Sequence, residues 1–494
     1  MSLSELLEYN PWWNDKKAIH EDPQIKAWEE SELKWIPGHM FKSNDYIYSL
    51  RGPRQVGKTT LIKLRILQIL KRIPQGNVMY YSFELENSPR DIITVINEYF
   101  NRPKQTKEKR RFIFLDEVSN IVNWQRAIKK LKDQGKLENC TVVVTGSHSM
   151  DVRHATELLP GRRGTTNNEI LDKILSPMKF SEYISTVDKQ MKREMEQRSL
   201  ISTIKRSAII KNLIRGKIDN DLMELSTYQN ELNKHFDNYL LTGGIPTVVN
   251  EFVKNGFIQN SFYETQLDTI TGDLKRANKD ISYIAQLIPN IITSIGTEIS
   301  WNTLKKNSDI GSHHTVEEYV KTLADMFVLS IFYKYNSVSK MPKFDSGKKI
   351  YFRDPFFLHG LNGSIHQKES FKQSAKSLDD PKFKSSIVEQ IVAEHMTRLA
   401  FNITERKIGF NYQYSAFYWK NKNKKEVDFV VRNGDSFIPV EVKYQNQIKK
   451  DDLYGIIDFK KIANIKNGIV LTKDQLRGES EAVLIPTSLF LLLV

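Results

Sequence analysis

The most specific chemical pattern in this sequence is a glycine-rich loop that ends in lysine and threonine. Gly52 and Gly57 are separated by four residues, and Lys58 and Thr59 follow at once. Glycines at these positions permit tight turns that aim backbone amides at phosphate groups. In such a loop the lysine reaches the β- and γ-phosphates, and the threonine hydroxyl contacts Mg²⁺. The spacing therefore predicts a nucleotide-phosphate site made by Gly52, Pro53, Arg54, Gln55, Val56, Gly57, Lys58, Thr59 and Thr60.

A second pattern is an apolar run, Phe112 to Leu115, that ends in Asp116 and Glu117. A strand that brings Asp116 beside the glycine-rich loop would let its carboxylate hold the water shell of Mg²⁺. Glu117 would then orient and deprotonate the attacking water. Alone, this pattern also suits a strand that ends in two solvated acids. Paired with the loop, it predicts binding and hydrolysis of ATP with Mg²⁺.

Polar and basic residues after the next apolar run are candidates for contacts with the transferred phosphate. Thr145 and Ser147 could touch the γ-phosphate or the attacking water, although an ordinary strand-to-loop turn has the same composition. Arg162 or Arg163 could act as an arginine finger, within the chain or from a neighbouring subunit. Adjacent arginines are also common in solvated loops, and Arg276 is a weaker rival.

Near the end of the chain, two acids and a lysine recur on strand-like runs. Asp428 lies in one apolar run, and Glu441 and Lys443 end the next. Residues two apart on a strand share a face, so Glu441 and Lys443 point the same way, and a hairpin would add Asp428. Two carboxylates with a lysine can hold Mg²⁺ and position water at a phosphodiester. Glu389, on the preceding helix, would be a further ligand or a supporting group. The alternative is an ordinary set of ion pairs matched across strands.

The elements that must position these residues form at least two α/β regions. Between residues 45 and 165, short apolar strands alternate with amphipathic helices, as in a doubly wound parallel sheet. The expected strands are Tyr46–Leu50, Val78–Glu84, Arg111–Leu115 and Thr141–Thr145. The expected division is an arm over 1–44, a P-loop core over 45–165, a helical region over 166–240, a winged-helix-like domain over 241–345 and a second α/β domain over 346–494.

The middle of the chain has the order of a winged helix. Residues 299–307 and 311–327 are expected to be helices, and Val328–Tyr335 the wing. The basic segment Lys340–Lys349 is expected to be a turn that could meet a phosphate backbone. A winged helix can equally serve as a packing module between domains.

Composition sets the class of protein. The chain has 494 residues, which is too long for one core, and 40% apolar with 27% charged residues is typical of a soluble protein. No apolar run is long enough to span a membrane, and Met1–Asn10 has no secretory pattern. Cys140 is the only cysteine, which fits a cytoplasmic location. The net charge of +14 favours a nucleic acid partner, although a solvated basic surface is the alternative.

The order of these motifs resembles a family of prokaryotic, especially archaeal, AAA+ ATPases. In that family a P-loop domain precedes a winged-helix segment and a domain like the PD-(D/E)xK nucleases, an α/β fold of the restriction-endonuclease type. The resemblance rests on Leu50–Thr60, Leu115–Val118, Thr145–Ser147, Leu175–Tyr183, Tyr239–Pro246 and the C-terminal acids. It implies ATP hydrolysis, a nucleic-acid context and, as is common in AAA+ proteins, a homo-oligomer. It also implies that Asp428 and the Glu441-Val442-Lys443 segment form the nuclease-type set.

Two functions follow as expectations. The first is an ATP-hydrolysing AAA+ protein that acts on DNA and has a metal-dependent nuclease-like domain. The second is an ATP-dependent signalling or assembly switch, whose C-terminal domain is a binding module that does not cleave.

Overall fold

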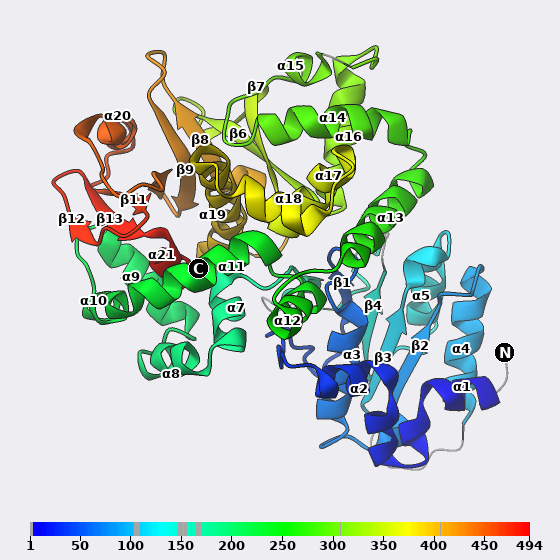
Figure 1. The fold of residues 1–494 in the computed structure, drawn as a ribbon. Helices are drawn as coiled ribbons and strands as arrows, with labels where there is room; N and C mark the ends of the chain where they lie inside the picture. The colour runs from blue at the N-terminus through cyan, green and yellow to red at the C-terminus, as the bar shows by residue number, and fades with distance from the viewer. Residues whose placement is uncertain are drawn as a thin grey trace. The chain divides into compact units, whose positions relative to one another are not determined.

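The computed structural model describes residues 3–102, 109–146, 152, 156–159, 161–164, 169–306, 308–405 and 407–494. The chain folds into two compact units, Met1–Ser176 and Pro177–Val494, which can be followed by colour in Figure 1. Within the described ranges, no helix combines the length and the apolar character needed to cross a lipid bilayer.

The N-terminal unit is built around a parallel five-stranded sheet in the order β2-β3-β4-β1-β5. The strands are β1 Ile47–Arg51, β2 Val78–Ser82, β3 Arg111–Asp116, β4 Cys140–Thr145 and β5 Asp172–Ile174. The helices are α1 Leu3–Tyr9, α2 Pro23–Glu30, α3 Lys58–Ile69, α4 Pro89–Asn101 and α5 Trp124–Asp133. This agrees with the expected α/β fold and with four of its strands to within two residues at each end.

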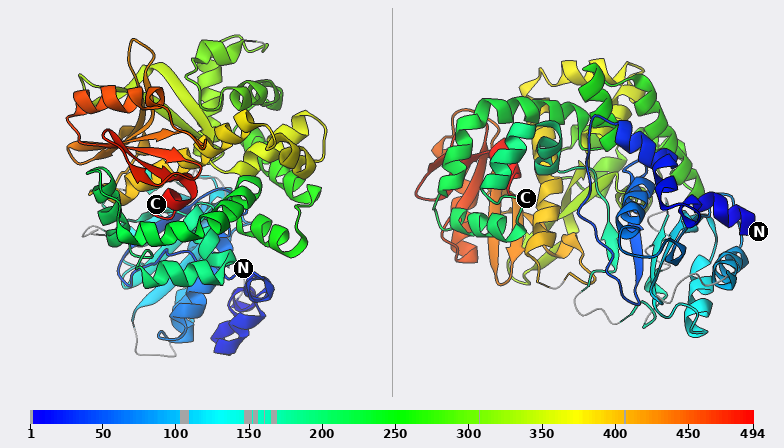
Figure 2. Two further views of the ribbon diagram at one scale, coloured as in Figure 1. Left: turned by 60° about the vertical axis from the view of Figure 1, so that its left-hand side comes forward. Right: turned by 90° about the horizontal axis from the view of Figure 1, so that it is seen from below.

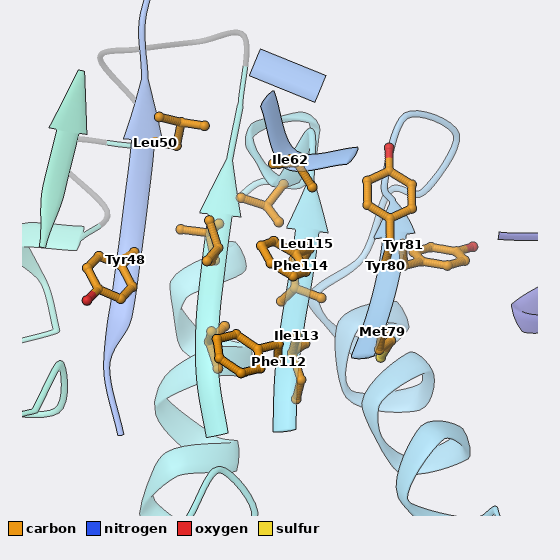
Figure 3. Close-up of a cluster of buried hydrophobic side chains, with 14 of the residues drawn as sticks. Tyr48, Leu50, Ile62, Met79, Tyr80, Tyr81, Phe112, Ile113, Phe114 and Leu115 are labelled. Carbon is orange, nitrogen blue, oxygen red and sulfur yellow. The ribbon is translucent and has the colours of Figure 1, made fainter. Parts of the chain in front are cut away.

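The core of this sheet explains why those strands form. Residues on β1, β2 and β3 are buried on both faces, as strands in a covered parallel sheet are. Figure 3 shows their side chains packed together with Ile62 of α3. The fifth strand, β5, lies in the region that the sequence analysis expected to be helical. It has only three residues and none of them is buried, so no apolar run marks it as a strand.

The N-terminal arm covers the edge strand of this sheet. The Asn10 side chain accepts a hydrogen bond from the Tyr80 amide at 2.7 Å and donates to the Tyr80 carbonyl at 2.9 Å. The indole nitrogens of Trp12 and Trp13 both donate to the Val78 carbonyl. Because β2 is an outer strand, these side chains satisfy backbone groups that would otherwise face another chain.

The C-terminal unit contains a mixed eight-stranded sheet in the order β12-β13-β11-β10-β9-β8-β6-β7. Its strands are β6 Leu329–Asn336, β7 Met341–Phe352, β8 Ala416–Lys420, β9 Glu426–Asn433, β10 Ser436–Val442, β11 Gly468–Thr472, β12 Arg477–Gly478 and β13 Ala482–Pro486. The long helix α19 Pro381–Ile403 packs against β9 and β10, and Figure 2 shows it beside these strands.

The other helices of this unit surround the sheet or form the middle of the chain. They are α7 Phe180–Val187, α8 Lys189–Gln197, α9 Thr203–Leu213, α10 Asn220–Leu225, α11 Gln229–Thr242, α12 Pro246–Asn255, α13 Asn260–Arg276, α14 Ile281–Thr293, α15 Trp301–Lys305, α16 His313–Asp325, α17 Pro355–Ile365, α18 Ser370–Ser377, α20 Tyr454–Ala463 and α21 Thr487–Leu491.

The segment predicted to be a wing forms a β-hairpin that also belongs to the C-terminal sheet. Helices α15 and α16 and strand β6 lie where they were expected, and β6 forms a hairpin with β7. What differs is that this hairpin joins the C-terminal sheet, because β6 also pairs with β8. Strand β6 is buried along most of its length, as an inner strand must be. The segment expected to be a basic turn is mostly strand β7, and Lys348 and Lys349 at its end are buried.

Two of the motif segments that carry the family resemblance meet inside the C-terminal unit. The Met178 amide donates to the Gly244 carbonyl at 2.8 Å, and the Gly244 amide donates to Asp354 at 2.8 Å. Gly243 has φ +62°, and a Cβ there would lie 1.8 Å from an Asp354 oxygen. The Thr-Gly-Gly-Ile-Pro segment therefore packs so closely against Asp354 and Met178 that its two glycines leave no space for a Cβ atom.

Candidate functional site

The glycine-rich loop connects β1 to α3 in the N-terminal unit. Gly52, Gln55 and Gly57 all have positive φ, which turns the loop tightly before α3 begins at Lys58. Lys58 is 7% exposed, and its ammonium donates to the carbonyls of Gly52 and Pro53 at 3.1 and 2.9 Å. The first amides of α3 have no partner within the helix and carry its positive dipole end. This arrangement suits an anion held at the helix start.

Asp116 lies at the carboxyl end of β3, beside this loop. The Thr59 hydroxyl donates to one Asp116 oxygen at 2.8 Å, and the Thr145 hydroxyl donates to the other. The strand register explains why these side chains meet. Thr145 at the end of β4 pairs with Leu50, which lies two residues before Gly52, and β3 pairs with β4 on its other side. The sequence prediction that Asp116 joins Lys58 and Thr59 is thus matched by the geometry.

Tyr80 is a member of this site that sequence reasoning missed. Its hydroxyl donates to Asp116 at 3.0 Å, and burial raises its pKa well above the usual value, so it stays protonated. Lys63 of α3 lies 3.5 Å from the Tyr80 ring centroid and pairs with Asp22 at 2.9 Å. A tyrosine in an apolar strand looks like a core residue, and only the register with β3 reveals its hydroxyl contact.

Glu117 directly follows Asp116 and has φ +54°. This left-handed conformation is unusual for a residue with a side chain, and it turns the chain out of β3 into a short helical turn. The Glu117 amide donates to Asp116 at 3.1 Å. Thr145 lies at the site, whereas Ser147 lies outside the described residues.

The two candidate arginine fingers have other partners in this structure. Arg163 donates to the carbonyls of Ile47 and Leu171 and pairs with Asp172 at 2.9 Å, so it brackets β1 and β5. Arg163 thus binds at Ile47, the first residue of β1, whereas the phosphate loop follows the last residue of this strand. The two ends of β1 are about 13 Å apart at 3.3 Å per residue. Arg162 pairs with Asp133 at the end of α5 at 2.7 Å. The structure does not bring either guanidinium to the loop of its own chain.

The C-terminal unit brings the three predicted acids and the predicted lysine together. Strands β9 and β10 form the expected hairpin, with Val440 opposite Phe429. One Asp428 oxygen accepts from the Val442 amide at 2.9 Å, and one Glu441 oxygen accepts from the Asp428 amide at 3.2 Å. The other Glu441 oxygen accepts from Lys443 at 2.6 Å. The carboxylates are thus held by the strand backbone.

A residue that sequence reasoning placed in an exposed turn lies at the centre of this set. The Lys349 ammonium, on β7, is 2.8 Å from Asp428, 3.2 Å from Glu389 and 2.5 Å from Glu426. The Lys349 side chain is fully buried. Its signal in the sequence is weak: a lysine that heads the apolar run Ile350 to Phe352. We call Lys349, Glu389, Glu426, Asp428, Glu441 and Lys443 the carboxylate cluster.

Burial and mutual charge shift the pKa values in the cluster. Burial, with help from the Asp428 charge, raises the pKa of Glu441 to about 8 and that of Glu389 to about 7. Burial also opposes ionisation of Asp428, but Lys349 and Lys443 outweigh it and lower its pKa. Burial would lower the pKa of Lys349, yet the surrounding carboxylates outweigh this and raise it. Lys349 therefore remains an ammonium ion.

The cluster balances its own charge. Lys420 extends it, 3.0 Å from Glu426 and 3.2 Å from Glu298. The ammonium groups of Lys349, Lys420 and Lys443 offset much of the carboxylate charge, and the raised pKa values of Glu389 and Glu441 favour their neutral forms. Buried charges in proteins are stable only when they are paired in this way.

The two sites differ in how they fit a divalent cation. At the P-loop, the Thr59 hydroxyl and the Asp116 carboxylate are oxygen donors of the kind that Mg²⁺ prefers. The carboxylate cluster fits the expected metal poorly, because a lysine ammonium already lies against Asp428 and Glu389. Among the described residues, no group of three or more acids, histidines or cysteines has the geometry to hold a metal ion.

Comparisons with known sequences assign part of the chain. Residues 44–184 match an AAA domain. Residues 233–368 and 384–490 match two domains of unknown function, DUF8612 and DUF4143. The chain is 22% identical over 457 residues to an uncharacterised protein of Methanocaldococcus jannaschii, covering 88% of this chain and 84% of that protein. It is also 22% identical over 440 residues to an uncharacterised protein of Haemophilus influenzae, covering 85% and 89%.

Two solved structures that the chain resembles are distant matches. A Walker-type ATPase of Pyrococcus abyssi has a TM-score of 0.39 and 13% identity, covering 70% of this chain and 97% of that one. The Orc1 protein of Aeropyrum pernix in complex with DNA has a TM-score of 0.29 and 10% identity, covering 73% and 97%. At these scores the likeness carries no conclusion about function. The AAA match and the phosphate-loop geometry agree: the chain contains an AAA-type P-loop ATPase domain over residues 44–184.

Proposed function

We propose that this protein binds ATP with Mg²⁺ at the P-loop, hydrolyses it, and uses the cycle to act on nucleic acid. When bound, Mg²⁺ would neutralise charge on the phosphates as the terminal bond breaks. Lys58 would bind the β- and γ-phosphates in place of the loop carbonyls it now contacts. Thr59 and Asp116 would hold the ion.

The observation that carries this proposal is the contact between Thr59 and Asp116. These residues are 57 positions apart, on α3 and at the end of β3, yet the hydroxyl and the carboxylate are 2.8 Å apart. Lys58, whose side chain carries the ammonium, is the first residue of the same helix. A phosphate-binding loop, a cationic side chain and a metal-binding pair at one point is the set that phosphoryl transfer requires.

Glu117 is the proposed base that takes a proton from the attacking water, and Thr145 the proposed contact to that water or the γ-phosphate. The turn at Glu117 supports this role, because residues held in uncommon backbone conformations cluster at active sites. Because Arg162 and Arg163 bind elsewhere in their own chain, either of them would act as an arginine finger at the P-loop of a neighbouring copy.

The experiment that tests this proposal is steady-state phosphate release by the full chain. Wild type should release phosphate with Mg²⁺, and Lys58→Ala should abolish turnover, because the β- and γ-phosphates lose their cation. Unchanged hydrolysis in Lys58→Ala would refute the assignment of the P-loop.

Action on nucleic acid is supported by the net charge of +14. The same assay should show turnover that rises with duplex, single-stranded or branched DNA, and a rise that weakens with added salt. Turnover that ignores every form of DNA and RNA would remove this part of the proposal and leave the ATPase assignment in place.

A second candidate is an assembly switch with a C-terminal region that does not cleave. The position of Lys349 among the carboxylates favours it over a metal-dependent nuclease. Oligomer size that changes with ATP, measured by light scattering, together with turnover indifferent to nucleic acid, would select the switch.

A further inference from the structure

The carboxylate cluster already contains a cation, supplied by the chain itself. The Lys349 ammonium lies 2.8 Å from Asp428 and 3.2 Å from Glu389, and it touches Glu426 as well. Asp428 and Glu389 are two of the residues expected to hold Mg²⁺. A cation that contacts both of them takes the position that a divalent ion would need.

The remaining oxygens of the cluster are also engaged. Both oxygens of Asp428 accept hydrogen bonds, one from Lys349 and the other from the Val442 amide. Both oxygens of Glu441 accept as well, from Lys443 and from the Asp428 amide. A metal ion would have to share each of these oxygens with a donor that already binds it.

The surroundings of Glu389 leave little space for an ion with its water shell. The Tyr351 hydroxyl donates to the Glu389 oxygen that also accepts from Lys349, at 2.7 Å. The second Glu389 oxygen faces Gly296, where an added Cβ would lie only 2.7 Å away. Gly296 has φ +76° and brings its backbone close to the carboxylate.

Strand geometry fixes Lys349 in this position. Successive side chains on a strand point to opposite faces, so Lys348 and Lys349 face opposite ways. The Lys348 ammonium lies 3.9 Å from the Trp301 ring centroid, outside the cluster. Lys349 comes from the segment matching DUF8612, whereas Asp428 and Glu389 come from the segment matching DUF4143. The ion pairs therefore join two parts of the chain that have separate sequence signatures.

We propose that Lys349 is the resident cation of this cluster in place of a divalent metal, so that the cluster joins β7 to α19 and β9 and does not cleave phosphodiesters. This role is independent of ATP hydrolysis, and its failure would leave the P-loop proposal untouched. Lys443, Glu441 and Asp428 then serve as members of a structural network of hydrogen bonds and ion pairs rather than as catalytic residues.

The first test compares the wild-type full chain with Asp428→Asn, which keeps the size and shape of the side chain. Binding of Mn²⁺ without nucleotide is measured by electron paramagnetic resonance for wild type and Asp428→Asn. The two should bind the same number of Mn²⁺ ions, and neither should nick plasmid DNA with Mn²⁺. An ion bound by wild type and lost in Asp428→Asn, or nicking that depends on Asp428, would overturn the proposal.

The second test removes the internal cation. Lys349→Met leaves Asp428 and Glu389 without their ammonium, so this variant should gain one Mn²⁺ and melt several degrees higher with Mn²⁺ than without it. Lys348→Met, the matched control on the other face of β7, should show neither effect. The gain should vanish in the double variant Lys349→Met with Asp428→Asn.

The second test can contradict the proposal as well. If Lys349→Met gains no Mn²⁺, Lys349 does not stand in a metal position, and the proposal fails. If Lys349→Met is recovered folded only when Mn²⁺ is present, the metal has replaced the lysine, as the proposal requires.

Discussion

Asp116 and Asp428 are both buried acids on sheets, and the sequence marks both as Mg²⁺ ligands, yet their surroundings differ. Asp116 accepts hydrogen bonds from three hydroxyl groups, which are neutral. Asp428 lies 2.8 Å from the ammonium of Lys349, which is buried with it. The hydroxyl partners of Asp116 carry no charge, whereas Asp428 is paired with a cation of its own chain.

This difference teaches where a metal can bind. Hydroxyl donors can turn aside for a cation, so an acid held by them gains a large Coulomb energy when Mg²⁺ arrives. An acid already paired with a buried lysine gains little, since the ion must first displace the ammonium. The same residue types therefore predict a metal site in one unit and a structural ion-pair cluster in the other.

The largest expected effect is a loss of ATP turnover, which should follow a change at the P-loop and not the same change in the carboxylate cluster. Glu117→Gln removes the proposed base and should lower the ATP turnover number by about 10²–10⁴-fold, while binding of a fluorescent ATP analogue is retained. Glu441→Gln, the same change in the carboxylate cluster, should leave turnover unchanged. Equal losses in the two variants would show that the two sites are not functionally separate.

The next effect concerns stability. Lys349→Met breaks a buried ion-pair group and should lower the free energy of unfolding of the C-terminal unit by about 3–5 kcal/mol. Lys348→Met should cost less, about 2 kcal/mol, because it removes only the contact of a buried ammonium with an aromatic ring, and burial already lowers the pKa of Lys348 to about 8. Urea unfolding followed by the fluorescence of Trp301 and Trp419 measures both. Similar midpoints for the two variants would contradict the central position of Lys349.

The pH dependence of the free energy of unfolding tests the protonation of Glu441 in the carboxylate cluster. Glu441 has a folded pKa of about 8, whereas its ordinary value is 4.5. Between these values the folded state holds a proton that the unfolded state has lost, so the free energy of unfolding falls as pH rises through this window. Glu441→Gln should flatten that fall by at most about 1.4 kcal/mol per pH unit. An identical slope in wild type and variant, in urea titrations from pH 5 to 8, would contradict the assigned protonation.

The smallest expected effect is at the P-loop. Tyr80→Phe removes one of the hydroxyl groups that hold Asp116 and should lower the stability of the N-terminal unit by roughly 1–2 kcal/mol. Tyr81→Phe is the control, because the Tyr81 hydroxyl binds Glu86 outside the site. Thermal unfolding compares the two, and a larger loss in Tyr81→Phe would argue against a positioning role for Tyr80.

The parts of the structure that the sequence predicts are those with local signatures. Four strands of the N-terminal sheet, the loop at Lys58 and the acid at Asp116 follow from periodicity and spacing. The hairpin that joins Asp428 to Glu441 follows from alternation along two adjacent strands. Each of these depends on residues that are close in sequence or on one well-known motif.

The parts that the sequence does not predict depend on contacts between distant residues. Strand β5 is too short to show a pattern, and its place beside β1 is fixed partly by Arg163. Lys349 looks like part of an exposed basic turn because its partners are 40 and 79 residues away. Tyr80 looks like core because its hydroxyl contact is made across two strands.

One measurement tests the comparison most directly. Mn²⁺ bound by the full chain is counted by electron paramagnetic resonance, with and without a non-hydrolysable ATP analogue, in wild type, Asp116→Asn and Asp428→Asn. The account predicts one nucleotide-dependent Mn²⁺ that Asp116→Asn loses and Asp428→Asn keeps. A Mn²⁺ ion that disappears in Asp428→Asn, or survives in Asp116→Asn, would contradict it.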